Sequence, residues 1–289
     1  MIQEGSTMQA EDIDFLIIGA AKCATTWLQQ SLQADPDVSM PDPELHYFSR
    51  HCERGDDWYF RQFHRTRPGQ LVGEKSNSYL DTPSAPQRVH RLLPHVRLIV
   101  QLRNPVERAY SDYCMLFRRG EVDRDIESYL DVGRDSPGRF LAGGLYSAQL
   151  QAYLDLYPKD RLLVLFFEET VARPVEQLSK VRTFLNLPAS DVALPVAKKV
   201  KDRSEAMVGP QLRNVMKPLK PLVRPFRNTS LFEAARGALA GKIAYPPFPP
   251  RLRSRLVDFY AADVEQLGTL VQRDLSGWLV QSGGSTSLD

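Results

Sequence analysis

The stretch DFLIIGAAKCATTWLQQSLQA, residues 14–34, joins an apolar run to a segment of helical composition through a loop of small residues. The run from Asp14 to Gly19 has the length and apolar character of a buried strand, and the residues from Thr25 up to Pro36 have the spacing of a helix. A tight strand-to-helix loop directs backbone N–H groups and the positive end of the helix dipole at an anion. The stretch therefore predicts an α/β fold with a P-loop-like phosphate-binding loop.

Two more strand–helix units follow this first one. VRLIVQLR, residues 96–103, predicts a strand that leads into a helix closed by Gly120, and RLLVLFFEE, residues 161–169, predicts a strand followed by a helix from Pro174. Alternating strands and helices favour a mostly parallel central sheet flanked by helices. Such sheets bind ligands beyond the carboxyl ends of their strands.

The domain prediction is a single domain over residues 1–289 with an irregular helical cap. Its parts are a cofactor-binding core over residues 13–190, a basic, proline-rich cap and lid over 195–250, and a C-terminal helix over 251–279. Residues 198–227 carry nine lysines and arginines against Asp202 and Glu205, a local excess of seven positive charges. Because the whole chain carries a net charge of only +2, we expect any anion-binding site to be a local feature of the surface.

The composition indicates an ordinary soluble globular protein, with 43% hydrophobic and 25% charged residues. A net charge of +2 argues against a surface built for nucleic acid. The three cysteines are widely spaced, so they predict neither a disulfide framework nor a metal site and favour a reducing compartment. The polar N-terminus lacks the pattern of a signal peptide, and no apolar window is long enough to span a membrane. We therefore expect a cytoplasmic protein.

Three side chains in the first loop and at the start of its helix could bind a phosphate. Lys22 adds a full positive charge, and Thr25 and Thr26 offer hydroxyl donors at the start of the helix. A nucleotide-triphosphate loop, G-x-x-x-x-G-K-[ST], would need glycine and lysine where Ala24 and Thr25 stand. A cysteine-phosphatase loop would need an arginine where Gln29 follows, so neither of these two loop types fits.

The segment GAAKCATTW resembles the 5′-phosphosulfate loop of sulfotransferases that use 3′-phosphoadenosine 5′-phosphosulfate (PAPS), written K-x-G-T-T-W, with Ala24 in place of the glycine. The resemblance implies that the lysine contacts the 5′-phosphosulfate, that the threonines hold the 5′-phosphate and that the tryptophan stacks on adenine. The implied cofactor-binding residues are Lys22, Cys23, Ala24, Thr25, Thr26 and Trp27. Two alternatives stay open: Trp27 as a core aromatic and Cys23 as a small packing residue.

LRNPVERAYSDY, residues 102–113, is similar to the family segment R-D/N-P-x-x-R-x-x-S, in which the arginine and serine bind the 3′-phosphate. By this resemblance Arg103 and Ser111 take that role, and a planar guanidinium suits it because it grips a phosphate with two parallel hydrogen bonds. Taken alone, the segment is also a capped helix with Arg108 and Arg118 solvated on its surface. Two anion motifs in order, each at a strand–helix junction, favour the nucleotide interpretation.

MPDPELHYFSR, residues 40–50, resembles the K-E-x-H-F-F segment of heparan-sulfate-type sulfotransferases, the branch closest in motif. The resemblance implies that Glu44 is the catalytic base and that His46 assists. His46 is the alternative base, because imidazole titrates near neutrality. We expect both side chains on one side of an extended chain.

GEKSNSYL, residues 73–80, is similar to the family segment E-K-T/S-P-x-Y, whose lysine lies beside the transferred sulfuryl group. Lys75 takes that role, with Asn77 in place of the proline; the alternative is an exposed Glu74–Lys75 pair. The basic run at residues 197–206 falls where the family has a loop that closes over the cofactor. The candidates in this run are Lys198, Lys199, Lys201 and Arg203.

These motifs predict a PAPS-dependent sulfotransferase that moves a sulfuryl group to a hydroxyl or amine and releases 3′,5′-adenosine bisphosphate, without a metal. The expected partner is an acceptor substrate: a glycan, a lipid or a small metabolite. One alternative is a P-loop-type small-molecule kinase using ATP and Mg²⁺. The other is a non-catalytic module that binds anionic glycans or nucleic acid through the basic segment.

Overall fold

A computed structural model describes residues 8–134, 136–188, 207–208, 240–241 and 243–280, and packing divides the chain into two compact units. The first unit comprises Met1–Pro105, Leu145–Val200 and Ala261–Leu279. The second comprises Val106–Gly144, Lys201–Tyr260 and Val280–Asp289. The single-domain organisation stays a prediction.

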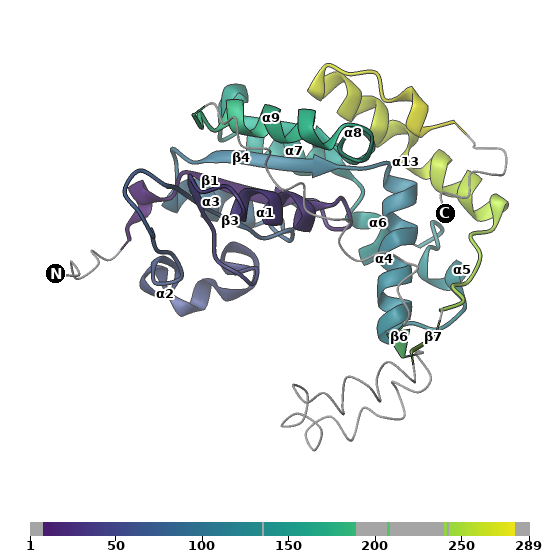
Figure 1. Ribbon diagram of the computed structural model, residues 1–289. Helices are drawn as coiled ribbons and strands as arrows, with labels where there is room; N and C mark the ends of the chain where they lie inside the picture. Colours follow the sequence, from purple (N-terminus) through teal and green to yellow (C-terminus); the bar gives the residue numbers. More distant parts are fainter. Residues whose placement is uncertain (1–7, 135, 189–206, 209–239, 242, 281–289) are drawn as a thin grey trace. The chain divides into compact units, whose positions relative to one another are not determined.

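The first unit is built on a five-stranded parallel sheet with the order β2-β3-β1-β4-β5. Figure 1 labels three of its strands, β1, β3 and β4. The strands are β1 (Phe15–Gly19), β2 (Val38–Ser39), β3 (Leu71–Lys75), β4 (Arg97–Leu102) and β5 (Leu162–Phe166). Strand β1 lies between β3 and β4, so the carboxyl ends of these three strands meet at one edge. The α/β prediction with a parallel sheet is confirmed, and this edge is where the site motifs begin.

Helices cover the sheet because its strands are apolar on both faces. The α-helices of this unit are α1 (Thr25–Gln33), α2 (Asp56–Phe60), α3 (Ala85–Leu92), α7 (Tyr146–Leu154), α8 (Phe167–Ala172) and α9 (Pro174–Phe184). The shorter helical turns are η1 (Ala10–Asp12), the π-helix η2 (Tyr47–His51), η3 (Cys52–Arg54), η4 (Lys159–Arg161) and η7 (Ser276–Trp278). Leu28 of α1 and Val181 of α9 share one buried cluster with Phe15 and Ile99 of the sheet, so α1 and α9 cover the same face.

Two features of the sheet differ from the sequence prediction. Strand β3 was not predicted, because its sequence LVGEK interrupts a short apolar run with glycine and two charges. Its Gly73 is needed there, since a Cβ would come within 2.5 Å of the Phe15 ring. The third predicted strand ends at Phe166 rather than at residue 169, because α8 begins at Phe167 with two glutamates in its first turn, where the helix dipole favours acidic side chains.

The second unit contains α4 (Pro105–Arg119, from Val106 onward), α5 (Ile126–Tyr129), α6 (Arg139–Ala142) and the antiparallel pair of β6 (Met207–Val208) and β7 (Ala240–Gly241). Helix α13 (Pro250–Val271) begins here and enters the first unit at Ala261. The predicted C-terminal helix over 251–279 therefore ends earlier, and η7 follows it. Most of the predicted cap over 195–250 lies outside the described residues.

Arg108 of the second unit is buried rather than solvated. Its guanidinium donates to the Phe140 carbonyl and lies 4.0 Å from Asp112. The interpretation of Arg108 as a surface residue is therefore wrong, and the side chain anchors α4 to the segment around α6. Across the residues that the structure describes, no helix combines the length and the apolarity that a bilayer crossing requires.

Candidate functional site

The first loop runs from Gly19 at the end of β1 to Thr25 at the start of α1. Gly19 passes so close to Leu80 that a Cβ would lie 2.7 Å from the Leu80 Cβ atom. Lys22 and Ala24 both adopt the left-handed conformation, with φ of 71° and 65°. Ala24 is the residue before the first helical one, so the N-terminal N–H groups of α1 open onto the loop. The loop thus has the backbone shape of an anion site.

Lys75 and Glu44 form an ion pair at the end of β3. The Lys75 Nζ atom lies 2.6 Å from Glu44 Oε1 and 3.5 Å from the Thr26 hydroxyl in the first turn of α1. The Lys75 side chain is only 2% exposed. The alternative of an exposed Glu74–Lys75 pair is therefore wrong, and the structure brings a candidate base, a candidate lysine and the phosphate loop together.

His46 lies beside the same carboxylate. Its Nε2 atom is 3.7 Å from Glu44 Oε2, so the two predicted bases do face one another. The backbone is not simply extended, however, because His46 has a φ of 50° and precedes the π-helix η2. Burial lowers the pKa of the imidazole, and the nearby Glu44 carboxylate opposes that shift. His46 is accordingly neutral at neutral pH.

Arg103 connects the second motif to the first loop. Its guanidinium Nη1 donates to the Lys22 carbonyl at 3.4 Å, and its guanidinium carbon Cζ lies 4.3 Å from the centroid of the Phe167 ring. The backbone carbonyl of Arg103 accepts a hydrogen bond from the Tyr146 hydroxyl. The end of β4 and the phosphate loop are thus neighbours, as one nucleotide bound to both would require. Ser111 lies in the second unit, half-buried on α4, and its pairing with Arg103 stays a prediction.

The other predicted cofactor residues fall into two groups. Trp27 is 7% exposed and belongs to the hydrophobic cluster under α1, which favours its interpretation as a core aromatic. Cys23 is also buried, with its sulfur 3.8 Å from the Tyr146 hydroxyl, as a packing residue would be. The candidates of the basic run lie outside the described residues: Lys198, Lys199, Lys201 and Arg203.

Asn77 is a site residue that the sequence did not reveal as one. Its backbone N–H donates to Glu44 Oε2 at 3.0 Å, and its side-chain amide reaches Glu44 Oε1 at 3.4 Å. A proline at this position, as in the family segment, could not make the first of these bonds because it has no N–H. The sequence signal for this role was the asparagine in place of the proline of the family segment. Its consequence is one more hydrogen bond to the Glu44 carboxylate.

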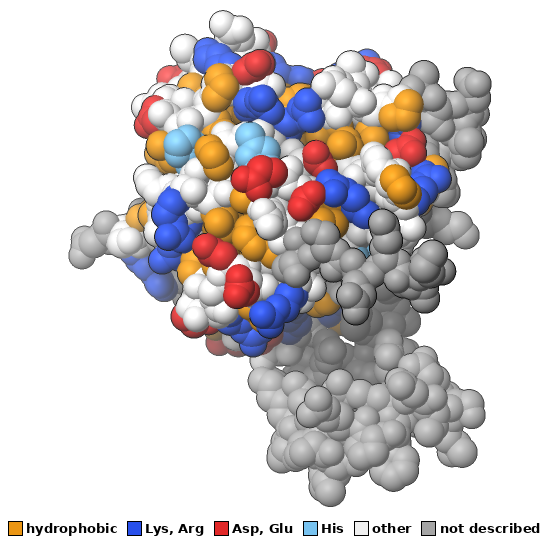
Figure 2. All heavy atoms as spheres, turned by 90° about the vertical axis from the view of Figure 1, so that its left-hand side faces the viewer, with side chains coloured by type: hydrophobic (Ala, Val, Ile, Leu, Met, Phe, Trp, Pro, Cys, Tyr) orange, Lys and Arg blue, Asp and Glu red, His pale blue; other side chains and the backbone are white. Residues whose placement is uncertain are grey.

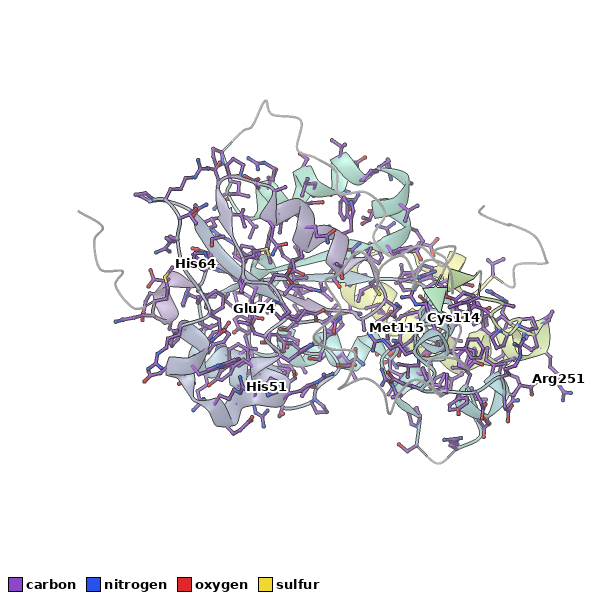
Figure 3. All side chains as sticks on the ribbon, turned by 60° about the horizontal axis from the view of Figure 1, so that its bottom comes forward. His51, His64, Glu74, Cys114, Met115 and Arg251 are labelled. Atoms are coloured by element: carbon purple, nitrogen blue, oxygen red, sulfur yellow. The ribbon has the colours of Figure 1, made fainter. Side chains whose placement is uncertain are left out.

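Glu74, next to Lys75 in the sequence, is buried in the interior of the first unit (Figure 3). Its carboxylate accepts hydrogen bonds from the Tyr79 hydroxyl at 2.6 Å and from the Ser76 hydroxyl at 2.7 Å. Burial raises the pKa of this group to about 7, although the hydroxyl donors oppose the shift. Ser76 also accepts the His46 N–H, so Glu74 supports the backbone at the site.

The raised pKa of Glu74 predicts a pH-dependent contribution to stability. The folded protein holds this proton more tightly than the unfolded chain, where the pKa is near 4.5. The stabilisation is therefore complete below pH 4.5 and lost as the pH rises through 7, a change of about 3 kcal/mol. We expect the free energy of unfolding of the wild type, minus that of Glu74→Gln, to fall by up to about this amount between pH 4.5 and pH 8. Urea unfolding across this range measures it, and a difference independent of pH would refute the assignment.

Comparisons with known proteins agree with the family resemblance of the motifs. Residues 12–208 match the family model described as "Sulfotransferase domain". Among similar curated proteins, human heparan sulfate glucosamine 3-O-sulfotransferase 6 is 35% identical over 176 residues, covering 60% of this chain and 52% of the relative. The bifunctional heparan sulfate N-deacetylase/N-sulfotransferase 1 of Caenorhabditis briggsae is 31% identical over 196 residues, covering 61% and 23%. The chain thus spans about half the length of the 3-O-sulfotransferase.

Solved structures agree with the fold. The crystal structure of a sulfotransferase from Alicyclobacillus acidocaldarius is 26% identical, with a TM-score of 0.68, and the match covers 92% of this chain and 98% of the other. A sulfotransferase domain from the curacin biosynthetic pathway shares the fold at 15% identity and a TM-score of 0.50. The resemblance seen in four short motifs therefore extends over most of the chain.

Proposed function

Because the chain belongs to the sulfotransferase domain family, we propose that it transfers a sulfuryl group from PAPS to a hydroxyl or amine of a glycan. One observation carries the proposal: the buried Lys75 ammonium contacts both Glu44 and the Thr26 hydroxyl of the phosphate loop. A proton acceptor and a positive charge thus lie beside the place where the loop would hold a phosphosulfate. Sulfuryl transfer needs both groups there.

In this proposal two neighbouring anion-binding sites, here called cradles, hold the donor nucleotide: the loop from Gly19 to Thr25 and the end of β4 at Arg103. The loop N–H groups, Lys22 and the hydroxyls of Thr25 and Thr26 bind the 5′-phosphosulfate. Arg103 binds the 3′-phosphate, and its contact with the Lys22 carbonyl keeps the two cradles adjacent. Ser111 and the basic run at residues 197–206 are further candidates. The donor is a substrate that leaves as 3′,5′-adenosine bisphosphate.

The transfer step is a single in-line displacement at sulfur. The acceptor oxygen or nitrogen forms a bond to sulfur while the bond between sulfur and the 5′-phosphate oxygen breaks, and the acceptor proton passes to the Glu44 carboxylate. Lys22 and Lys75 stabilise the negative charge that develops on the leaving phosphate and on the sulfuryl oxygens. Asn77 and Lys75 orient the carboxylate for this role.

A glycan acceptor is proposed because the relatives named above act, by their names, on heparan sulfate. The polyanion-binding alternative places binding in the basic segment over residues 198–227, most of which lies outside the described residues, so it stays a prediction. On the face drawn in Figure 2, basic and acidic side chains of the described residues lie interspersed with apolar ones. The kinase alternative lacks the loop glycine and lysine that its chemistry needs. The cytoplasmic location stays a prediction.

The proposal is tested by incubating the protein with PAPS labelled with ³⁵S and a panel of acceptors. The panel contains a heparan sulfate oligosaccharide, its N-desulfated form, a neutral oligosaccharide and a phenol. We expect label on a glycan and the release of 3′,5′-adenosine bisphosphate without added metal. Label transferred to the phenol alone would contradict the glycan acceptor, and ATP-dependent phosphorylation would contradict the proposed reaction.

A further inference from the structure

A chain of hydroxyl contacts runs from His46 away from Glu44. The His46 Nδ1 atom lies 2.7 Å from the Ser78 hydroxyl oxygen, which lies 2.6 Å from the Ser49 hydroxyl oxygen. The Ser49 hydroxyl in turn reaches the His46 carbonyl oxygen at 3.2 Å. These three residues come from the segment before η2, from η2 itself and from the turn after β3, so the chain closes a loop around the imidazole.

The number of available protons determines which atom donates in each of these hydrogen bonds. A carbonyl oxygen only accepts, so the Ser49 hydroxyl proton is the one in that contact. The contact between the two serines must then use the Ser78 proton, which leaves Ser78 only its lone pair for the imidazole. The Nδ1 atom therefore carries a proton and donates it. Only this arrangement satisfies all three contacts at once.

A neutral imidazole protonated on Nδ1 has a lone pair on Nε2. His46 is neutral at neutral pH because burial lowers its pKa. Its Nε2 atom, 3.7 Å from Glu44 Oε2, then presents a second proton acceptor beside the carboxylate. Two acceptors that face each other across this distance favour a donor group between them, and the hydroxyl or amine of the acceptor substrate is such a donor.

We propose that Ser78 is a positioning residue that fixes the Nδ1-protonated tautomer of His46, so that Nε2 and Glu44 together orient the proton-donating group of the acceptor substrate. The part of this inference that concerns the substrate rests on the proposed function, but the tautomer does not. In a variant without the Ser78 hydroxyl, Nε2 gains a proton in part of the molecules. That N–H would bind Glu44 and compete with the acceptor substrate for the carboxylate.

The decisive experiment reads the tautomer directly. Long-range ¹H–¹⁵N spectra of protein labelled on its five histidines give separate patterns for the two neutral tautomers, and His46→Gln identifies the His46 signals. We expect the Nδ1–H pattern in the wild type and in Ser78→Thr, and a mixture of both tautomers in Ser78→Ala. An Nε2–H pattern in the wild type, or an unchanged pattern in Ser78→Ala, would overturn the inference.

Kinetics test the consequence for the reaction. Ser78→Ala should lower kcat about ten-fold while the KM for PAPS stays unchanged, and Ser78→Thr should restore most of the rate. Ser84→Ala is the matched control, because Ser84 is exposed and its side chain caps no helix. If Ser78→Ala shifts the tautomer but leaves kcat unchanged, the role in orienting the substrate is wrong. If the wild type shows no sulfation at all, the proposed function fails and the tautomer assignment is judged on the spectra alone.

Discussion

Glu44→Gln should lower kcat by about two to four orders of magnitude, because an amide cannot take the acceptor proton. Binding of 3′,5′-adenosine bisphosphate should change little, since Glu44 contacts Lys75 and Asn77 rather than the loop backbone. The glutamine oxygen can still accept from Lys75. Its NH₂ group would then face the Asn77 N–H, so we also expect a loss of about 1–3 kcal/mol in the free energy of unfolding.

Single-turnover assays with saturating PAPS measure this effect, and urea unfolding shows that the variant is folded. Glu53→Gln is the matched control, because Glu53 is an exposed glutamate paired with a histidine, His51, at 3.6 Å. A Glu44→Gln variant that is folded and keeps the wild-type rate would show that another group takes the proton. His46 would then be the first residue to test, because its Nε2 atom, 3.7 Å from Glu44 Oε2, is a second proton acceptor beside the carboxylate.

Lys22→Ala should weaken the binding of 3′,5′-adenosine bisphosphate by about 10- to 100-fold, because a charge-assisted hydrogen bond to phosphate contributes about 1.5–3 kcal/mol. Turnover should fall further, since Lys22 also stabilises the charge on the leaving phosphate. The fold should tolerate the change. Alanine in the left-handed conformation at this position, with φ of 71°, is no more strained than lysine.

Calorimetric titration with the nucleotide measures the loss for Lys22→Ala. Lys159→Ala serves as the control, because Lys159 is an exposed lysine of the same unit in η4, before β5. Equal affinities of the wild type and Lys22→Ala for the nucleotide would remove this lysine from the donor site. Equal losses in both variants would instead indicate a general effect of charge.

The sequence predicted the strand–helix junctions because both signals are local there. The apolar runs of β1 and β4 are bounded by turn residues, and the helices after them show clear periodicity. β3 was missed because adjacent Glu74 and Lys75 are typical of an exposed loop. The buried Glu74 is bonded by the nearby hydroxyls of Ser76 and Tyr79, whereas Glu44, the partner of Lys75, comes from 31 residues away through long-range packing.

The site was predicted by motif and corrected by geometry. Glu44, His46 and Lys75 do meet, although the spacing alone could not show that His46 turns into a left-handed conformation. Trp27 matches the family motif, yet its side chain packs in the core because α1 turns that face to the sheet. The hydroxyls of Ser49 and Ser78 carry no sequence signal, since serines in a turn are commonplace.

The most direct test of the two-cradle account is a calorimetric cycle with two nucleotides and two proteins. Adenosine 5′-phosphate lacks the 3′-phosphate of 3′,5′-adenosine bisphosphate, and Arg103→Ala lacks the guanidinium assigned to it. In the wild type, loss of the 3′-phosphate should cost about 10- to 100-fold in affinity, and in Arg103→Ala it should cost only a few-fold. The same loss in both proteins would mean that Arg103 does not hold the 3′-phosphate, and the two cradles would not share one nucleotide.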